Sequence, residues 1–247
     1  MAGHSKFKNI QHRKGAQDKK RAKIFTRLIK ELSVAARSST DPASNPRLRS
    51  ALAAARSANM PKDNIDRVLK KAEGGEVEAY EEIRYEGYGP GGVAFIVEAM
   101  TDNRNRTASE IRSYFSKFGG TLAETGSVSF MFDKVGQIIY PISVANNEAM
   151  FDTALEAGAD NLETDVDSHI LTTTPEDFNS VRENMERCYS APEEASLVWR
   201  PQNTILVEEA NASTLLKLYD ALDENDDVQN VFSNFEISDE IMAKLDG

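Results

Sequence analysis

The sequence predicts an α+β protein of several domains, with a helical N-terminal domain followed by two α/β domains, one inserted into the other. Three observations lead to this prediction. The first 75 residues show only helical apolar periodicity, strands alternate with helices after residue 80, and the charge changes sign between the two parts. With 247 residues, the chain is long enough to bury more than one core without disulfides.

The N-terminal domain, residues 1–75, is predicted to hold three helices. Apolar side chains recur at helical spacing over 17–37, with Phe25 expected in the core. Pro46 suits the first turn of a second helix that runs to about residue 58. Pro61 can open a third helix, which Gly74-Gly75 ends. Its inward residues are expected to be Ile65, Val68, Leu69 and Ala72.

The inserted domain, residues 133–202, is predicted from its order of elements. Strands over 136–140, 162–165, 169–173 and 196–200 and helices over 147–157 and 176–188 give the order βαββαβ, which is ferredoxin-like. The flanking segments, 76–132 and 203–247, are predicted to be two halves of a second such domain. Its elements are strands over 93–100, 128–132, 204–207 and 228–235 and helices over 105–118 and 212–222, with Phe130 and Phe132 in the core.

Charge divides the chain more sharply than its total of −11 suggests. Residues 1–75 hold 18 Lys and Arg against 6 Asp and Glu, a charge of +12, so the other 172 residues carry −23. This asymmetry indicates an N-terminal domain that binds a polyanion. The alternative is a solvated basic face without a partner.

A stripe of cations is predicted on the first helix, where Lys20, Lys23, Arg27 and Lys30 recur every three or four residues. Such a stripe suits the phosphates of a nucleic acid, whereas few aromatic side chains are available for base stacking. Changing all four residues to Glu is expected to abolish binding without unfolding the chain. The candidate nucleic-acid-binding residues are Lys6, Phe7, Lys8, His12, Arg13, Lys14, Lys19, Lys20, Lys23, Arg27 and Lys30.

The segment Thr101-Asp-Asn-Arg-Asn-Arg-Thr joins a predicted strand to a predicted helix. Two roles are open for it. Asp102 or Asn103 caps the helix, or Arg104 and Arg106 form a secondary contact to an anion.

Motifs of catalysis and metal binding are absent from the sequence. Three histidines and one cysteine disfavour a metal site or a disulfide framework. Cys188 has no evident histidine base, because His169 is the only histidine of the body, as residues 76–247 are called here, and we expect a buried structural thiol. The glycine-rich segment 87–92 lacks the Lys-Ser/Thr of a phosphate loop, which favours a tight turn. We therefore predict no catalytic residue, no cofactor, no metal and no small-molecule substrate.

No apolar run approaches the roughly 20 residues that span a bilayer. The N-terminus also lacks the apolar region of a secretory signal. The sequence therefore predicts a cytoplasmic protein without a membrane partner.

Long collinear motifs resemble the YebC family. They begin with Met1-Ala-Gly-His-Ser-Lys-Phe-Lys-Asn-Ile-Gln-His-Arg-Lys and continue with Ala58-Asn-Met-Pro-Lys-Asp-Asn-Ile, Tyr85-Glu-Gly-Tyr-Gly-Pro-Gly-Gly, the 101–107 segment and Asp227-Val-Gln-Asn-Val-Phe-Ser-Asn-Phe. The resemblance covers nearly the whole chain. It implies the same three-domain layout, with an inserted third domain.

The resemblance also implies a regulator of gene expression. Relatives are described as aids to ribosomes stalled on proline runs, and a mitochondrial relative as a translational activator. The expected function is a non-enzymatic translation factor that contacts ribosomal RNA, and the ribosome, through the N-terminal domain. The alternative is a DNA-binding transcriptional regulator, the label that the family has long carried. The sequence disfavours specific DNA readout, since no helix-turn-helix recognition helix with base-reading Arg, Asn or Gln is evident.

Overall fold

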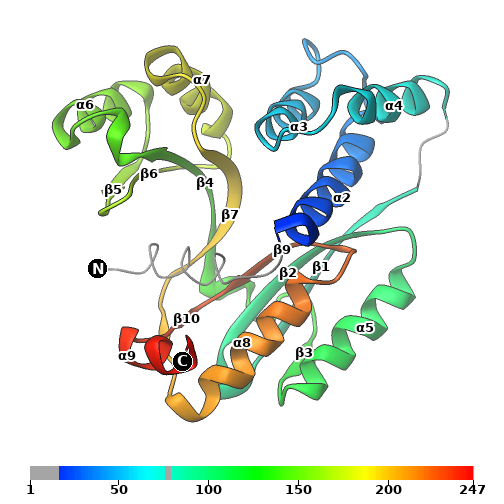
Figure 1. The fold of residues 1–247 in the computed structure, drawn as a ribbon, viewed down its shortest axis with the longest axis vertical. Coiled ribbons are helices and arrows are strands. Elements are labelled where there is room, and N and C mark those ends of the chain that lie inside the picture. Colours follow the sequence, from blue (N-terminus) through cyan, green and yellow to red (C-terminus); the bar gives the residue numbers. More distant parts are fainter. Residues whose placement is uncertain (1–16, 76–78, 247) are drawn as a thin grey trace. The chain divides into compact units, whose positions relative to one another are not determined.

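The computed structural model describes residues 17–75 and 79–246 and has an α+β fold (Figure 1). Residues 129–206 and 234–238 form one compact unit, and the other described residues form a second. The helical residues 17–75 therefore belong to the same unit as the first sheet. The boundaries of the three expected domains stay a prediction.

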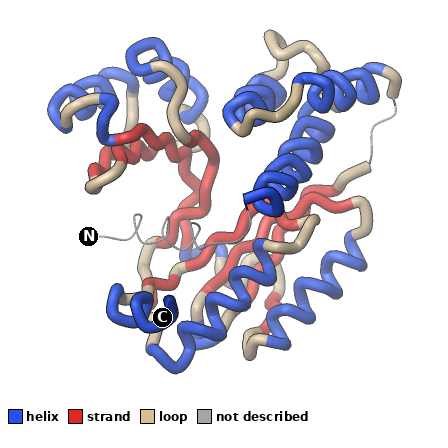
Figure 2. Tube along the Cα trace, in the orientation of Figure 1, coloured by secondary structure: helices blue, strands red, loops and turns tan. Residues whose placement is uncertain are grey.

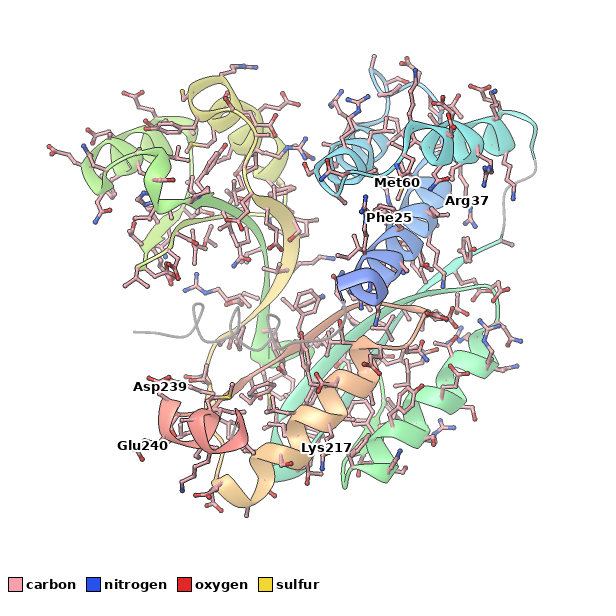
Figure 3. The ribbon with its side chains drawn as sticks, in the orientation of Figure 1. Phe25, Arg37, Met60, Lys217, Asp239 and Glu240 are labelled. Carbon is pink, nitrogen blue, oxygen red and sulfur yellow. The ribbon has the colours of Figure 1, made fainter. Side chains whose placement is uncertain are left out.

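Three helices form the described part of the N-terminal domain: α2 (Gln17–Ala35), α3 (Pro46–Ser57) and α4 (Lys62–Glu73). Their apolar faces meet in one core, and Figure 3 labels Met60, which belongs to it, and the partly buried Phe25, which packs against it. Asn45 fixes the connection between α2 and α3. Its Oδ1 accepts the backbone N–H of Leu48 at 3.0 Å, and its Nδ2 donates to the carbonyl of Ala35 at 2.8 Å. The core residues are Leu32, Ala35, Ala36, Leu48, Ala51, Leu52, Ala55, Met60, Ile65 and Val68.

The first sheet contains strands from both of the flanking sequence segments, 76–132 and 203–247. It contains β1 (Glu81–Tyr88), β2 (Ala94–Thr101), β3 (Thr121–Ala123) and β9 (Val228–Ser233), all antiparallel, in the order β3-β1-β2-β9. A hairpin, β1 and β2, precedes the helix α5 (Arg104–Lys117), and α8 (Glu209–Asp223) packs beside α5. The turn between β1 and β2 is the expected tight turn, and Gly91 and Gly92 adopt φ of 74° and 76° in it.

The inserted domain has the predicted βαββαβ order. Its elements are β4 (Phe132–Pro141), α6 (Asn147–Ala157), β5 (Asn161–Thr164), β6 (Ser168–Thr173), α7 (Phe178–Tyr189) and β7 (Glu194–Pro201). The strands form an antiparallel sheet in the order β5-β6-β4-β7, and the two helices pack on it (Figure 2). Its core contains Ile138, Tyr140, Met150, Leu171 and Met185.

Short elements complete the chain. β8 (Ile205–Leu206) and β10 (Phe235–Glu236) form a parallel pair, and α9 (Asp239–Asp246) follows at the C-terminal end of the described residues. Among the helices that the structure describes, none combines the length and the apolarity needed to cross a bilayer.

Two of the strands predicted in the body differ from the structure. Residues 128–132 do not form a strand, because a 3-10 turn over Ser129–Met131 separates buried Val128 from the start of β4. Phe130 is therefore 66% exposed instead of lying in a core. The predicted strand over 228–235 is also interrupted. β9 ends at Ser233, and the next strand, β10, pairs with β8 in a different sheet.

Candidate nucleic-acid interface

The cations of α2 are aligned as the sequence predicts, but three of them face an anion of the same chain. Lys23, Arg27 and Lys30 all contact the connection between α8 and β9. This connection, Asp223-Glu-Asn-Asp-Asp, holds four carboxylates in five residues and is here called the acidic turn (residues 223–227).

Lys30 is buried, so its expected exposure on the stripe was wrong. Its side-chain nitrogen donates to the carbonyls of Met100 and Asp226 at 3.1 and 2.8 Å and to Oδ1 of Asp227 at 2.8 Å. These three acceptors satisfy all three protons of the ammonium group. A buried ammonium needs such partners to offset its lost hydration, so loss of the acidic turn would leave Lys30 as an uncompensated buried charge.

Arg27 makes a comparable contact one turn earlier in α2. Its Nε donates to the carbonyl of Val228 at 3.0 Å, and its Nη2 donates to the carbonyl and to Oδ1 of Asp223 at 2.9 and 2.8 Å. The planar guanidinium is suited to such forked contacts. Its Nε and Nη2 are thus directed at the acidic turn and at Val228 next to it.

Lys23 is held less firmly. Its nitrogen lies 3.7 Å from Oδ2 of Asp223 and has no hydrogen-bond partner among the described residues. Burial, helped by the neighbouring charge of Arg27, lowers the pKa of Lys23 to about 8, although Asp223 opposes the shift. Lys23 is therefore a buried ammonium group beside the acidic turn, with an ion-pair contact to Asp223 but no hydrogen bond to a described residue.

Asp227 joins the acidic turn to the 101–107 segment. Its Oδ2 accepts hydrogen bonds from Thr107 Oγ1 at 2.7 Å, Arg106 Nη2 at 2.8 Å and Thr101 Oγ1 at 3.1 Å. Burial alone would raise the pKa of Asp227, but the hydrogen bonds from Arg106, Lys30 and Thr107 outweigh it and hold the pKa at about 2. The carboxylate is ionised at neutral pH and shared by two cations.

Asn103 of the 101–107 segment caps α5, which is one of the two roles that the sequence left open for this segment. Oδ1 of Asn103 accepts the backbone N–H of Arg106 at 3.1 Å. Arg106 pairs with Asp102 as well as with Asp227, so the anions in its contact are carboxylates of this chain. Arg104 is exposed, and its guanidinium forms no ion pair or hydrogen bond with a residue that the structure describes.

Acidification is expected to remove the stabilisation that Asp227 provides. Its folded-state pKa of about 2 lies below the ordinary 3.8, so the contribution is complete above that ordinary value and is lost as the pH falls toward 2. We expect the difference in unfolding free energy between the wild type and Asp227→Asn to shrink below about pH 4. Urea titrations over a pH series measure it. Asp226→Asn, which changes an exposed neighbour, is the control. If the difference in unfolding free energy from the wild type shrank equally for both variants, the role assigned to Asp227 would be contradicted.

Several cations of the helical domain are exposed and have no ion-pair partner among the described residues. They are Arg21, Arg56, Lys62, Arg67 and Lys70. By contrast, Arg47 bridges Glu31 and Glu82, and its Nε lies 2.7 Å from Oε1 of Glu31. A recess along α4 mixes both signs of charge, since Asp63, Asp66, Arg67, Lys70, Lys71 and Gly74 line it.

Part of the predicted site lies outside the described residues. This part contains Lys6, Phe7, Lys8, His12, Arg13 and Lys14, and the side chains of Lys19 and Lys20 are likewise not described. The acidic turn was not predicted to contact α2. Its run of four acids was the available signal, because a run of this kind is a natural partner for a cationic helix face.

The histidine and the cysteine of the body, His169 and Cys188, differ in their exposure. His169 is fully buried, and its ring nitrogens hydrogen-bond to Thr164 Oγ1 and to the carbonyl of Ala145, both at 2.9 Å. Cys188 is exposed, so the prediction of a buried thiol was wrong. It lies near the end of α7, and the core face of that helix is formed by Phe178, Val181 and Met185. Within the described ranges, no three His, Cys, Asp or Glu side chains gather as a metal ion requires.

Comparisons with known proteins match almost the whole chain. A family model described as the TACO1/YebC protein N-terminal domain matches residues 5–75, and one described as the TACO1/YebC second and third domain matches residues 80–235. The crystal structure of a conserved hypothetical protein from Aquifex aeolicus is similar, with 44% identity and a TM-score of 0.85. The match covers 94% of this chain and 97% of the Aquifex chain.

Proposed function

Because the chain belongs to the TACO1/YebC family, we propose that it is a non-enzymatic regulator that binds the phosphate backbone of ribosomal RNA through its N-terminal domain. It acts in the cytoplasm as a translation factor, with the ribosome as its partner and without a cofactor. The observation that carries the proposal is the charge of +12 over residues 1–75, opposite in sign to the rest of the chain.

The internal ion pairs narrow the proposed contact surface. Lys30 and Arg27 bind the acidic turn, so the phosphate contacts are assigned to the other cations. These are Lys6, Lys8, Arg13, Lys14, Lys19 and Lys20, followed in the sequence by the exposed Arg21. Lys23 is left out of this set because its side-chain nitrogen is buried. Arg104 is the second anion contact, since Arg106 is held by Asp227 and Asp102.

Crosslinking in cells, followed by sequencing of the attached nucleic acid, tests the proposal. We expect reads on large-subunit ribosomal RNA, and we expect Lys8→Gln, Lys14→Gln and Lys20→Gln together to remove them. The matched control removes three exposed cations of the body, Arg112→Gln, Lys117→Gln and Lys217→Gln, and Figure 3 labels Lys217 on α8. It should leave the reads unchanged.

Two outcomes contradict the proposal. Reads on discrete promoter DNA would favour the DNA-binding transcriptional regulator. Equal losses in the two triple variants would show that overall charge, and not the N-terminal domain, determines the association.

A further inference from the structure

The outer face of α6 carries an apolar pair that the inserted domain does not cover. Phe151 is 54% exposed and Leu155 is 65% exposed. They lie four residues apart, so they are neighbours on successive turns of the same face. The buried side of the helix packs into the core through Met150, Ala154 and Ala157. Single exposed apolar residues are ordinary, but two large ones in contact distance make a patch that water solvates poorly.

Carboxylates line one side of this pair. Glu148, Asp152 and Glu156 follow the same spacing and are exposed, and none of them forms an ion pair with a residue that the structure describes. The α6 patch is defined here as Glu148, Phe151, Asp152, Leu155 and Glu156. It combines an apolar pair with a row of three carboxylates along one side, here called the rim.

The cations of the inserted domain are engaged elsewhere. The domain, residues 133–202, has 14 Asp and Glu against 4 Lys and Arg. Arg200 pairs with Glu163, Arg182 is buried beside Glu186, Lys134 lies over the ring of Trp199 and Arg187 donates to Asn184. The negative potential of the α6 patch is therefore not neutralised by these groups.

We propose that the α6 patch docks a basic amphipathic segment of a protein partner. An apolar side chain of that segment packs between Phe151 and Leu155, and its Lys or Arg residues on adjacent turns pair with the three carboxylates. Charge complementarity selects this occupant. A phosphate backbone is repelled by the same carboxylates, so the patch distinguishes basic protein from nucleic acid.

A designed peptide tests the recognition chemistry. The probe is a Lys/Leu amphipathic helical peptide, titrated into the full chain by calorimetry. We expect Phe151→Ser with Leu155→Ser to weaken binding at least about tenfold, as the loss of a central apolar anchor does. Val166→Ser is the matched control, because Val166 is 83% exposed in the turn between β5 and β6. Unchanged affinity in the double variant overturns the proposal.

A second pair of variants tests the rim. Glu148→Gln, Asp152→Asn and Glu156→Gln together should weaken peptide binding and reduce its salt dependence. Asp160→Asn, Asp167→Asn and Glu176→Gln remove the same charge from exposed sites in the same domain. Equal effects of the two triple variants would mean nonspecific attraction and would overturn the proposal. All these positions are exposed, so unfolding midpoints equal to that of the wild type are expected and verify folding.

A photo-crosslinking residue at position 151 of the full chain identifies the occupant in cells. Capture of a basic protein that disappears in the rim variant supports the proposal. Crosslinks to RNA, to a second copy, to the chain's own N-terminal domain, or to nothing overturn it. The patch is independent of the N-terminal cations, so Lys8→Gln, Lys14→Gln and Lys20→Gln should leave peptide binding intact even where RNA binding is lost.

Discussion

Replacing Asp227 by Ala is expected to lower the free energy of unfolding by about 3 kcal/mol. Asp227 accepts hydrogen bonds from Lys30, Arg106, Thr101 and Thr107. Lys30 is only 7% exposed, so removal of the carboxylate leaves an uncompensated ammonium group in a buried site. Truncating one partner of such a pair costs more than the intact pair contributes, because the remaining charge has lost both its partner and its water.

Urea unfolding at neutral pH measures this change, and Asp226→Ala provides the matched control. Asp226 lies next to Asp227, carries the same charge and is exposed, and Lys30 contacts its backbone carbonyl only. The control variant should change stability by less than about 0.5 kcal/mol. Equal effects of the two variants would refute the role given to the Lys30–Asp227 pair.

Affinity for ribosomal RNA should fall roughly 10³- to 10⁵-fold between 50 and 200 mM salt, as expected for six to ten phosphate contacts. The reason is counterion release, since each Lys or Arg that neutralises a phosphate frees a condensed cation into solution. A fluorescence titration of the full chain against a large-subunit ribosomal RNA fragment measures it. A response that is flat in salt would indicate that a protein surface, and not phosphate, is bound.

The matched triple variants sharpen this experiment. Losing Lys8, Lys14 and Lys20 should reduce the slope of log affinity against log salt by about two to three, and losing Arg112, Lys117 and Lys217 should leave it unchanged. The variant first suggested by the sequence, with Glu at positions 20, 23, 27 and 30, does not isolate binding. Lys30→Glu and Arg27→Glu would place new carboxylates against the acidic turn and so destabilise the fold.

The sequence predicted most elements because their signals are local. Asn147–Ala157 was predicted to the residue, since Asn146 caps α6 and Gly158 ends it with a left-handed conformation at φ 92°. Pro46 and Gly74 marked helix ends in the same way. Phe130 was misplaced because alternation of apolar residues over 128–132 resembles a strand, while the chain there passes from one sheet to another.

The candidate site, too, follows partly from local sequence signals and partly from tertiary contacts. By itself, the sequence determined that Lys23, Arg27 and Lys30 share one helix face and that residues 1–75 carry the positive charge, because helical spacing and charge are properties of the chain alone. Only the tertiary structure decided which anion these side chains meet. Helix spacing sets the direction of a side chain but not the element opposite it, and folding brings the acidic turn, about 200 residues away, against α2. Because of this contact Lys30, which the sequence predicts on an exposed surface, is buried.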